Sequence, residues 1–160
     1  MQLSRFLLLV TSSIIAGSAW AKEDKRDAKE LYCLAQNIYF EARGEPQNGQ
    51  FAVAAVTMNR VASPKFPNSI CKVVWQRYQF SWTHDGKSDR PRDRKAWSQA
   101  KSIADLVYKK YFAIQEKTQG AWDLTRGALH YYSPSMANPY WAKEAQLSAV
   151  IGNHVFVSIN

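Results

Sequence analysis

Glu41 is the residue of this chain whose type and position best suit it for chemistry. Apolar side chains recur through residues 31–42 at the three- and four-residue steps of an amphipathic helix, which directs one helix face at a core. Glu41 follows Ile38 by three residues and points toward that same face. Burying a carboxylate there costs free energy unless the group is paired, or is held neutral for a chemical role. We therefore predict that Glu41 is a catalytic carboxylic acid.

The end of this helix should favour the protonated form of Glu41. Gly44 and Pro46 stop the helix just after it, so the carboxyl lies in the last turn. The partial negative charge of the terminal carbonyls disfavours a second negative charge there. Burial and the helix end should both raise the pKa of Glu41, as a general acid near neutral pH requires. Arg43 would lower that pKa if it reaches the carboxyl.

Other kinds of site have weaker signals. The three histidines are His84, His130 and His154, and a zinc site built from them with Asp85 or Asp123 lacks any paired-ligand spacing. We therefore predict no metal and no cofactor. The chain has no nucleophile elbow, no phosphate-binding glycine loop and no nucleic-acid-binding signature, so we expect no nucleic-acid partner. Carboxylate chemistry beside aromatic side chains remains, which is typical of enzymes that cleave sugar polymers.

The N-terminus has the pattern of a secretory signal. Arg5 precedes the apolar run 6–10, and residues 19–21 have the small-x-small form of a signal-peptidase site. Residues 11–13 make the run too short and too polar for a comfortable membrane span, although an uncleaved anchor is the alternative. We predict a signal peptide at 1–21, a mature protein in the periplasm or secreted, and no stable membrane insertion after cleavage.

The predicted mature chain, 22–160, has 139 residues, enough for one domain with its own core. The net charge of the whole chain is +8, and removal of Arg5 with the signal leaves +7. This charge suits an anionic partner such as a cell wall, or serves only solubility, and charge alone does not choose between them. We expect a monomer.

Cys33 and Cys71 are the two cysteines. An even number in an oxidising compartment favours a disulfide, which would close a long loop and stabilise the fold by roughly 4 kcal/mol. The alternative is a catalytic thiol at Cys33 with a distant histidine, but nothing around Cys33 makes an electropositive setting.

The body of the domain is expected to be helical. Residues 22–29 are charged and should fray, with Asp27 as the N-cap of a helix that begins near Ala28. Residues 50–61 are apolar almost all round, which is typical of a central core helix. Further helices are expected from Ser69 to Trp75 and over 94–115.

The C-terminal third changes period. Residues 128–133 alternate and are rich in aromatics, which predicts a strand. Residues 149–151 and 154–158 flank Gly152-Asn153, a hairpin turn pattern. Together these elements predict an α+β fold, a helical body with a small antiparallel sheet.

Six stretches resemble the SleB/CwlJ-type cell wall hydrolases, in order along nearly the whole mature chain. The most specific part is E-A-R-G-E, followed by G-Q-x-A-V-A and N-R-V. The resemblance implies that 22–160 is a compact catalytic domain related to lysozyme-like transglycosylases, acting on the glycan strands of peptidoglycan. The stretches are YFEARGEP (39–46), GQFAVAAVTMNRV (49–61), FPNSICKVVWQ (66–76), QFSWTHDG (79–86), GALHYY (127–132) and IGNHVFV (151–157).

The resemblance places the catalytic acid on Glu41 and implies lytic transglycosylase chemistry at the bond after N-acetylmuramic acid. One carboxyl group then suffices, because the muramyl 6-hydroxyl is the nucleophile. Asp85, Asp123 or Glu45 could supply a second carboxylate for simple hydrolysis, which stays open. Glu45 is also the rival acid, although turn or helix-cap hydrogen bonding is the plainer role beside Pro46.

The resemblance also implies contacts with substrate. Phe80 and Ser81 fall on a loop that faces the groove, although the same loop could be an ordinary exposed one with a buried aromatic anchor. His130 and Tyr131 could orient the sugar or stabilise oxocarbenium character, and His130 could instead be a satisfied buried histidine. Arg60 is expected in a structural ion pair. Because no separate peptidoglycan-binding domain is evident, affinity should come from the groove and the basic surface, and a non-catalytic glycan-binding protein is the competing class.

Overall fold

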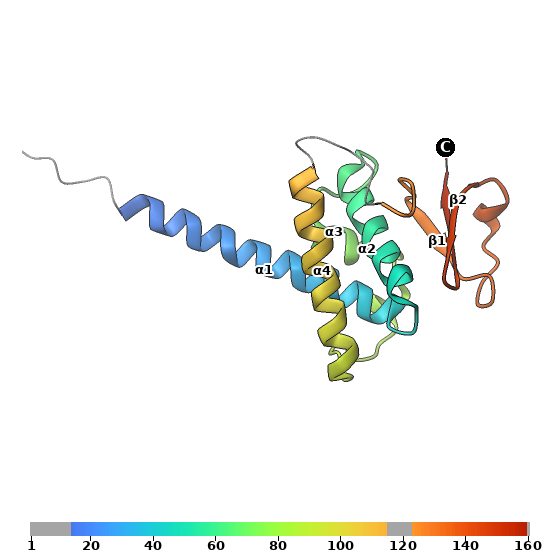
Figure 1. Ribbon diagram of the computed structural model, residues 1–160, viewed down its shortest axis with the longest axis horizontal. Helices are drawn as coiled ribbons and strands as arrows, with labels where there is room; N and C mark the ends of the chain where they lie inside the picture. The colour runs from blue at the N-terminus through green and yellow to red at the C-terminus, as the bar shows by residue number, and fades with distance from the viewer. Residues whose placement is uncertain (1–13, 115–122, 160) are drawn as a thin grey trace, which may run out of the picture.

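The computed structural model describes residues 14–114 and 123–159, with side chains from 27–112 and 123–159. The C-terminal part of α1 forms one body with the other helices while its N-terminal part projects away from them, and a small sheet lies beside this body, next to α2 (Figure 1). The predicted α+β architecture is confirmed. The helices are α1 (Ile14–Ala42), α2 (Gln47–Ala62), α3 (Ile70–Val74) and α4 (Arg94–Ile114), with 3₁₀ turns η1 (Ser81–His84) and η2 (Tyr140–Lys143), and the strands are β1 (His130–Tyr132), β2 (Gln146–Ile151) and β3 (His154–Ser158).

Helix α1 is longer than the sequence pattern indicated. It runs unbroken from Ile14, so the predictions that 22–29 frays and that Asp27 caps the helix are wrong. Six of the eight residues at 22–29 are Lys, Glu, Arg or Ala, which favour helix, and none is Gly or Pro, so the intrinsic propensity of the stretch sustains the helix. The Asp27 carboxylate instead accepts a hydrogen bond from Tyr108 Oη at 2.8 Å, which ties α1 to α4.

The C-terminal part of α1 packs among the other helices through its predicted apolar face. Leu34 and Ile38 are fully buried against α2 and α4, and Ala42 is buried at the end. Helix α2 is the central core helix, with residues 52–58 all buried, and it begins at Gln47 rather than at residue 50. Its first turn is polar, so a pattern of apolar residues does not reveal it.

A buried polar network fixes the helices relative to one another. Asn37 Nδ2 donates to Thr57 Oγ1 at 3.1 Å, and Trp82 Nε1 donates to Asn37 Oδ1 at 3.3 Å. These bonds join α1, α2 and η1 inside the core, where polar groups are costly unless they are paired. The network places the loop that contains η1 against α1.

The predicted disulfide is present between Cys33 and Cys71, 38 residues apart in sequence. It joins α1 to α3 and leaves no free cysteine among the described residues, so the catalytic-thiol alternative is wrong.

The sheet has the order β1-β3-β2 and is antiparallel throughout. The hairpin turn at Gly152-Asn153 is where it was predicted, and Gly152 takes the left-handed φ of 59° that such a turn uses. Phe156 of β3 is fully buried with Ala52 and Val56 of α2, so β3 holds the sheet on the helical body. Strand β1, which pairs with β3, is thereby brought beside the end of α1.

Within the described ranges, the structure contains no helix both long enough and apolar enough to cross a membrane.

Candidate active site

Glu41 lies in the last turn of α1, as predicted, and its side chain is partly exposed. Its Oε2 accepts a hydrogen bond of 3.0 Å from Tyr131 Oη of β1. Burial raises the pKa of Glu41, and this outweighs the hydrogen bond from Tyr131 and the positive charge of Arg60, which both lower it. The carboxyl is therefore disposed to hold a proton at higher pH than an ordinary glutamate while remaining accessible.

Tyr131 is the partner that the sequence did not connect with Glu41, 90 residues away. It pairs with Phe156 across β1 and β3, and its ring lies 5.2 Å from that of His154. Burial and the nearby Glu41 raise the pKa of Tyr131 well above its usual value, so the phenol keeps its proton and acts as a donor.

Arg60 of α2 is the cation of this site. It is 4% exposed, its Nε donates to Leu129 O at 2.7 Å, and its guanidinium lies 5.2 Å from the ring centres of both Phe66 and Phe80. The predicted structural ion pair is wrong, because no described carboxylate lies within 4.0 Å of it. The last turn of α2 holds the guanidinium between a backbone carbonyl and two rings, and its charge acts on Glu41 through space. Its Nη1 is buried with no hydrogen-bond partner among the described residues.

Arg43 does not act on Glu41 as the sequence suggested it could. Its guanidinium lies 5.0 Å from the ring centre of Tyr39, and the cation that lowers the Glu41 pKa is Arg60. Two residues along a helix correspond to a rotation of roughly 200°, so Arg43 leaves the helix on nearly the opposite side from Glu41.

Of the predicted substrate contacts on the loop that contains η1, Phe80 is buried and Ser81 is exposed. Phe80 is 2% exposed and packs in the core beneath Arg60, so its ring offers little surface to a ligand. Ser81 is exposed at the first position of η1. The structure therefore supports the buried-anchor reading for Phe80 and leaves Ser81 available for contact.

His130 is next to Tyr131 on β1, so the two side chains leave opposite faces of the strand. The His130 ring lies 6.1 Å from that of Phe66 and 5.8 Å from that of Trp141. Burial, and after it the charges of Arg60 and Lys65, lower the pKa of His130, so it is neutral at pH 7. His130 belongs to an aromatic wall on the other face from the Glu41–Tyr131 pair.

Glu45, the rival acid, connects two parts of the fold. Its Oε2 accepts from Asn153 N at 2.8 Å and its Oε1 accepts from Asn153 Nδ2 at 3.0 Å, across 108 residues. Burial would raise the pKa of Glu45, but the two Asn153 hydrogen bonds and His154 outweigh it and lower the pKa. His154 Nδ1 lies 3.8 Å from Oε2, and because burial lowers the pKa of His154, this contact is not a charged pair at pH 7. Glu45 thus latches the hairpin turn to the α1–α2 turn.

The other two acids considered as a second carboxylate are also engaged. Asp123 accepts hydrogen bonds from Asn59 Nδ2, from Thr125 N and Oγ1, and from Gly127 N, at 2.6–2.8 Å, and so shapes the turn before β1. The Asp85 carboxylate accepts from Lys87 N at 2.8 Å in an exposed loop. No three His, Cys, Asp or Glu side chains of the described residues gather into a metal site.

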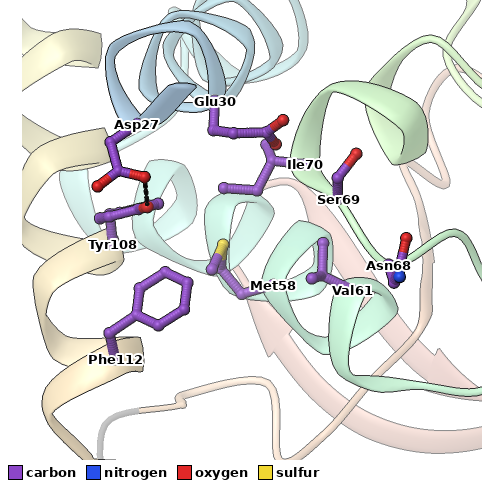
Figure 2. Close-up of a pocket in the computed structure, with 9 residues that line it drawn as sticks. All are labelled: Asp27, Glu30, Met58, Val61, Asn68, Ser69, Ile70, Tyr108 and Phe112. Atoms are coloured by element: carbon purple, nitrogen blue, oxygen red, sulfur yellow. Dashed lines mark hydrogen bonds between the residues drawn. The ribbon is translucent and has the colours of Figure 1, made fainter. Parts of the chain in front are cut away.

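A pocket of about 390 Å³ lies elsewhere, between the middle of α1, the C-terminal turns of α2 and α4, and the start of α3 (Figure 2). At 1.5 Å per residue, Glu30 is about 16 Å along α1 from Glu41. The carboxylates of Asp27 and Glu30 accept from Tyr108 Oη and from Cys71 N, so both serve the fold. The pocket is lined by Asp27, Glu30, Met58, Val61, Asn68, Ser69, Ile70, Tyr108 and Phe112.

Residues 44–157 match the family described as Cell Wall Hydrolase. The chain belongs to this family. The match begins three residues after Glu41, so it includes Glu45, Arg60, His130 and Tyr131 but not Glu41 itself.

Relatives and solved structures agree with the family. The spore cortex-lytic enzyme of Bacillus subtilis (strain 168) is 33% identical over 127 residues, covering 79% of this chain and 37% of the relative, and that of Bacillus cereus is 32% identical, covering 79% and 43%. The chain thus spans less than half the length of these relatives. The catalytic domain of the germination-specific lytic transglycosylase SleB from Bacillus anthracis matches with 32% identity and a TM-score of 0.64, over 81% of this chain and 93% of that one. The catalytic domain of the Bacillus cereus SleB protein gives 30% and 0.60, over 81% and 89%. The predicted family and the lytic-transglycosylase-like fold are confirmed.

Proposed function

We propose that this protein cleaves the glycan strands of peptidoglycan after N-acetylmuramic acid, as a lytic transglycosylase with Glu41 as its acid and base. The observation that carries the proposal is the Glu41–Tyr131 pair, a carboxyl whose pKa is raised by burial and whose geometry is held by a phenol from the sheet. Similarity to the SleB lytic transglycosylase domain supports the same reaction class.

In the first step, protonated Glu41 transfers its proton to the glycosidic oxygen as the bond from that oxygen to the anomeric carbon breaks. The electron pair leaves with the oxygen, and positive charge develops on the sugar ring. The carboxylate that remains keeps the hydrogen bond from Tyr131, and the charge of Arg60 stabilises it further. Tyr131 is thus a positioning residue in this scheme.

In the second step, the Glu41 carboxylate accepts the proton of the muramyl 6-hydroxyl while that oxygen bonds to the anomeric carbon. The product has a 1,6-anhydro end, and Glu41 regains the proton needed for the next cycle. No water is consumed. The scheme needs one carboxyl, which is supported by the hydrogen bonds that engage Glu45, Asp123 and Asp85 elsewhere.

The test is digestion of purified sacculi followed by mass spectrometry of the soluble products. Wild type should release muropeptides with anhydro ends, and Glu41→Gln should lower release by about 10²–10⁴-fold, the usual contribution of a general acid. Asp105→Asn is the matched control, because it makes the same carboxylate-to-amide change in an exposed pair with Lys109 on α4. It should behave as wild type.

Each other result has a definite meaning. Near-wild-type release by Glu41→Gln would remove the assignment of the acid. Reducing ends in place of anhydro ends would show a hydrolase that activates water. Binding of sacculi without any new glycan end would show a non-catalytic glycan-binding protein.

We also propose that the protein acts in the cell envelope, as a monomer, after removal of residues 1–21. The names of the relatives, which are spore cortex-lytic enzymes, support an extracellular or envelope substrate. N-terminal sequencing of the exported protein tests the cleavage site, and a mature N-terminus at Lys22 is expected.

A further inference from the structure

Arg60 is a charge without a counter-charge in the interior of the protein. It is 4% exposed, and no described carboxylate lies within 4.0 Å of its guanidinium. Its Nη1 is buried and has no hydrogen-bond partner among the residues that the structure describes. Burying an unpaired charge and an unpaired donor costs folding free energy, so a side chain in this state points to a role beyond folding.

The surroundings of the guanidinium hold it in place without neutralising it. Its carbon lies 5.2 Å from the ring centres of Phe66 and Phe80, and its Nε donates to Leu129 O at 2.7 Å. Two rings and a carbonyl attract a cation, but none of them carries a negative charge. The positive charge of Arg60 therefore acts on the groups around it, in an interior where salt and water screen charges little.

The groups within reach of this charge are those of the Glu41–Tyr131 pair. Leu129, which anchors Arg60, precedes Tyr131 by two residues, and Tyr131 Oη donates to Glu41 Oε2 at 3.0 Å. The positive charge of Arg60 lowers the pKa of Glu41, and in return the negative charge of Glu41 raises the pKa of Arg60. The two side chains are thus electrostatically coupled across α1 and α2.

Other titratable groups around the pair do not replace Arg60. Tyr131 keeps its proton, because burial and the neighbouring acid raise its pKa well above the usual value. Burial lowers the pKa of His154, whose ring packs against Tyr131, and of His130 on the other face of β1, so both are neutral at pH 7. The carboxylate of Glu45 is engaged by the hairpin turn. Arg60 is the cation that acts on the acid.

We propose that Arg60 is a positioning residue, left unpaired in the resting enzyme so that its counter-charge is the Glu41 carboxylate formed during the reaction. This inference rests on the proposed function and deepens it. In the resting state the carboxyl is neutral, and once its proton has passed to the glycosidic oxygen the carboxylate and the guanidinium attract each other. An attraction that exists only after proton transfer lowers the barrier to bond cleavage and leaves substrate binding unchanged.

Neutral and charged replacements separate this role from a structural one. Arg60→Gln removes the charge and keeps a side-chain N–H donor, Arg60→Met is a second neutral variant, and Arg60→Lys keeps the charge. Arg43→Met is the matched control. It also removes an arginine, one that lies two residues after Glu41, has its guanidinium over the ring of Tyr39 and does not act on the acid.

The first readout is direct and needs no turnover. The Glu41 carboxyl is titrated by NMR in protein labelled with ¹³C-glutamate, and the signal is identified by its loss in Glu41→Gln. In both neutral variants the pKa of Glu41 should rise by about one pH unit, because an attracting charge has been removed. Arg60→Lys and Arg43→Met should leave it near the wild-type value.

Turnover of sacculi gives the second readout. The neutral variants should lower kcat about tenfold and leave KM unchanged, because Arg60 contacts no substrate. The alkaline limb of their kcat/KM profile should move to higher pH by about one pH unit, since the acid then holds its proton more tightly. Arg60→Lys should recover most of kcat and the wild-type limb, which a purely structural role of the arginine would not allow.

Four outcomes overturn the inference. They are an unchanged pKa of Glu41 in the neutral variants, an equal rise of that pKa in Arg43→Met, an equal loss of kcat in Arg60→Lys and in the neutral variants, and failure of both neutral variants to fold. Absence of turnover by wild type would overturn the proposed function instead, and the NMR titration would still decide whether Arg60 acts on Glu41.

Discussion

Substituting Glu45 tests whether this residue is a structural latch or the acid of the reaction. Glu45→Gln keeps the size of the side chain and removes its charge. In wild type both carboxylate oxygens accept from Asn153, at 2.8 and 3.0 Å. The amide can keep only one of these acceptors, and its own NH₂ group then faces the Asn153 amide donor.

The expected loss of stability follows from these contacts. A hydrogen bond to a charged group contributes about 1.5–3 kcal/mol, and one of the two survives in weakened form, so we expect the free energy of unfolding to fall by about 1–3 kcal/mol. With a urea m-value of about 2 kcal/mol/M for a domain of this size, the unfolding midpoint should fall by about 1 M.

The pH dependence has a definite sign. Because the pKa of Glu45 is lowered in the folded protein, its stabilisation is present above the ordinary value of 4.5 and is lost as pH falls through the folded pKa. The difference in unfolding free energy between wild type and Glu45→Gln should therefore be constant near neutral pH and shrink on acidification.

Urea unfolding and muropeptide release, measured on the same preparations, distinguish a structural role of Glu45 from a catalytic one. Glu45→Gln should lose stability. Under conditions where it is folded, its activity should stay within about tenfold of wild type, because Glu45 acts only indirectly, on the hairpin that supports Tyr131 through β3. Gly152→Ala should reproduce this result, because a methyl group at Gly152 collides with Glu45 Oε2 and the φ of 59° is strained for alanine. The exposed Glu144→Gln is the control and should change neither quantity.

The reasoning is refuted if Glu45→Gln retains its unfolding free energy and loses activity by a hundredfold or more. Glu45 would then be the acid, and the hydrogen bonds to Asn153 would be incidental.

Three further predictions concern Glu41, its partner and the disulfide. Tyr131→Phe removes a hydrogen bond that stabilises the Glu41 carboxylate, so the pKa of Glu41 should rise. The alkaline limb of the kcat/KM profile should then move to higher pH by about one pH unit. An alkaline limb that does not move would contradict the pairing of Glu41 with Tyr131. Glu41→Gln should be more stable than wild type at pH 7, because burial raises the pKa of this carboxyl and so disfavours its charged form. The difference should vanish as pH falls to about 4.5. Urea unfolding midpoints measured across pH check the sign of this stability difference. Replacing Cys33 and Cys71 by alanine should cost about 4 kcal/mol of unfolding free energy for a 38-residue separation, and reductant should cost wild type a similar amount while leaving the variant unchanged.

The position of Glu41 was predictable because its causes are local. The apolar period of residues 31–42 and the stop at Gly44 and Pro46 act within a few residues, and they place a carboxyl at the buried end of a helix. The hairpin at Gly152-Asn153 was predictable for the same reason. Patterns of this kind failed where the helix had no apolar period to detect, as in the charged stretch 22–29 of α1.

The surroundings of Glu41 depend on tertiary packing. Tyr131 is 90 residues away, and it reaches Glu41 because Phe156 seats the sheet on α2 and β1 pairs with β3. Arg60 is set beside the site by the position of α2 against α1, not by its distance along the chain. Local sequence therefore selected Glu41 as the proposed acid. The packing of sheet on helix decided its hydrogen-bond donor, its nearby cation and the partner of Glu45, because contacts between distant segments depend on relative orientations that no local periodicity encodes.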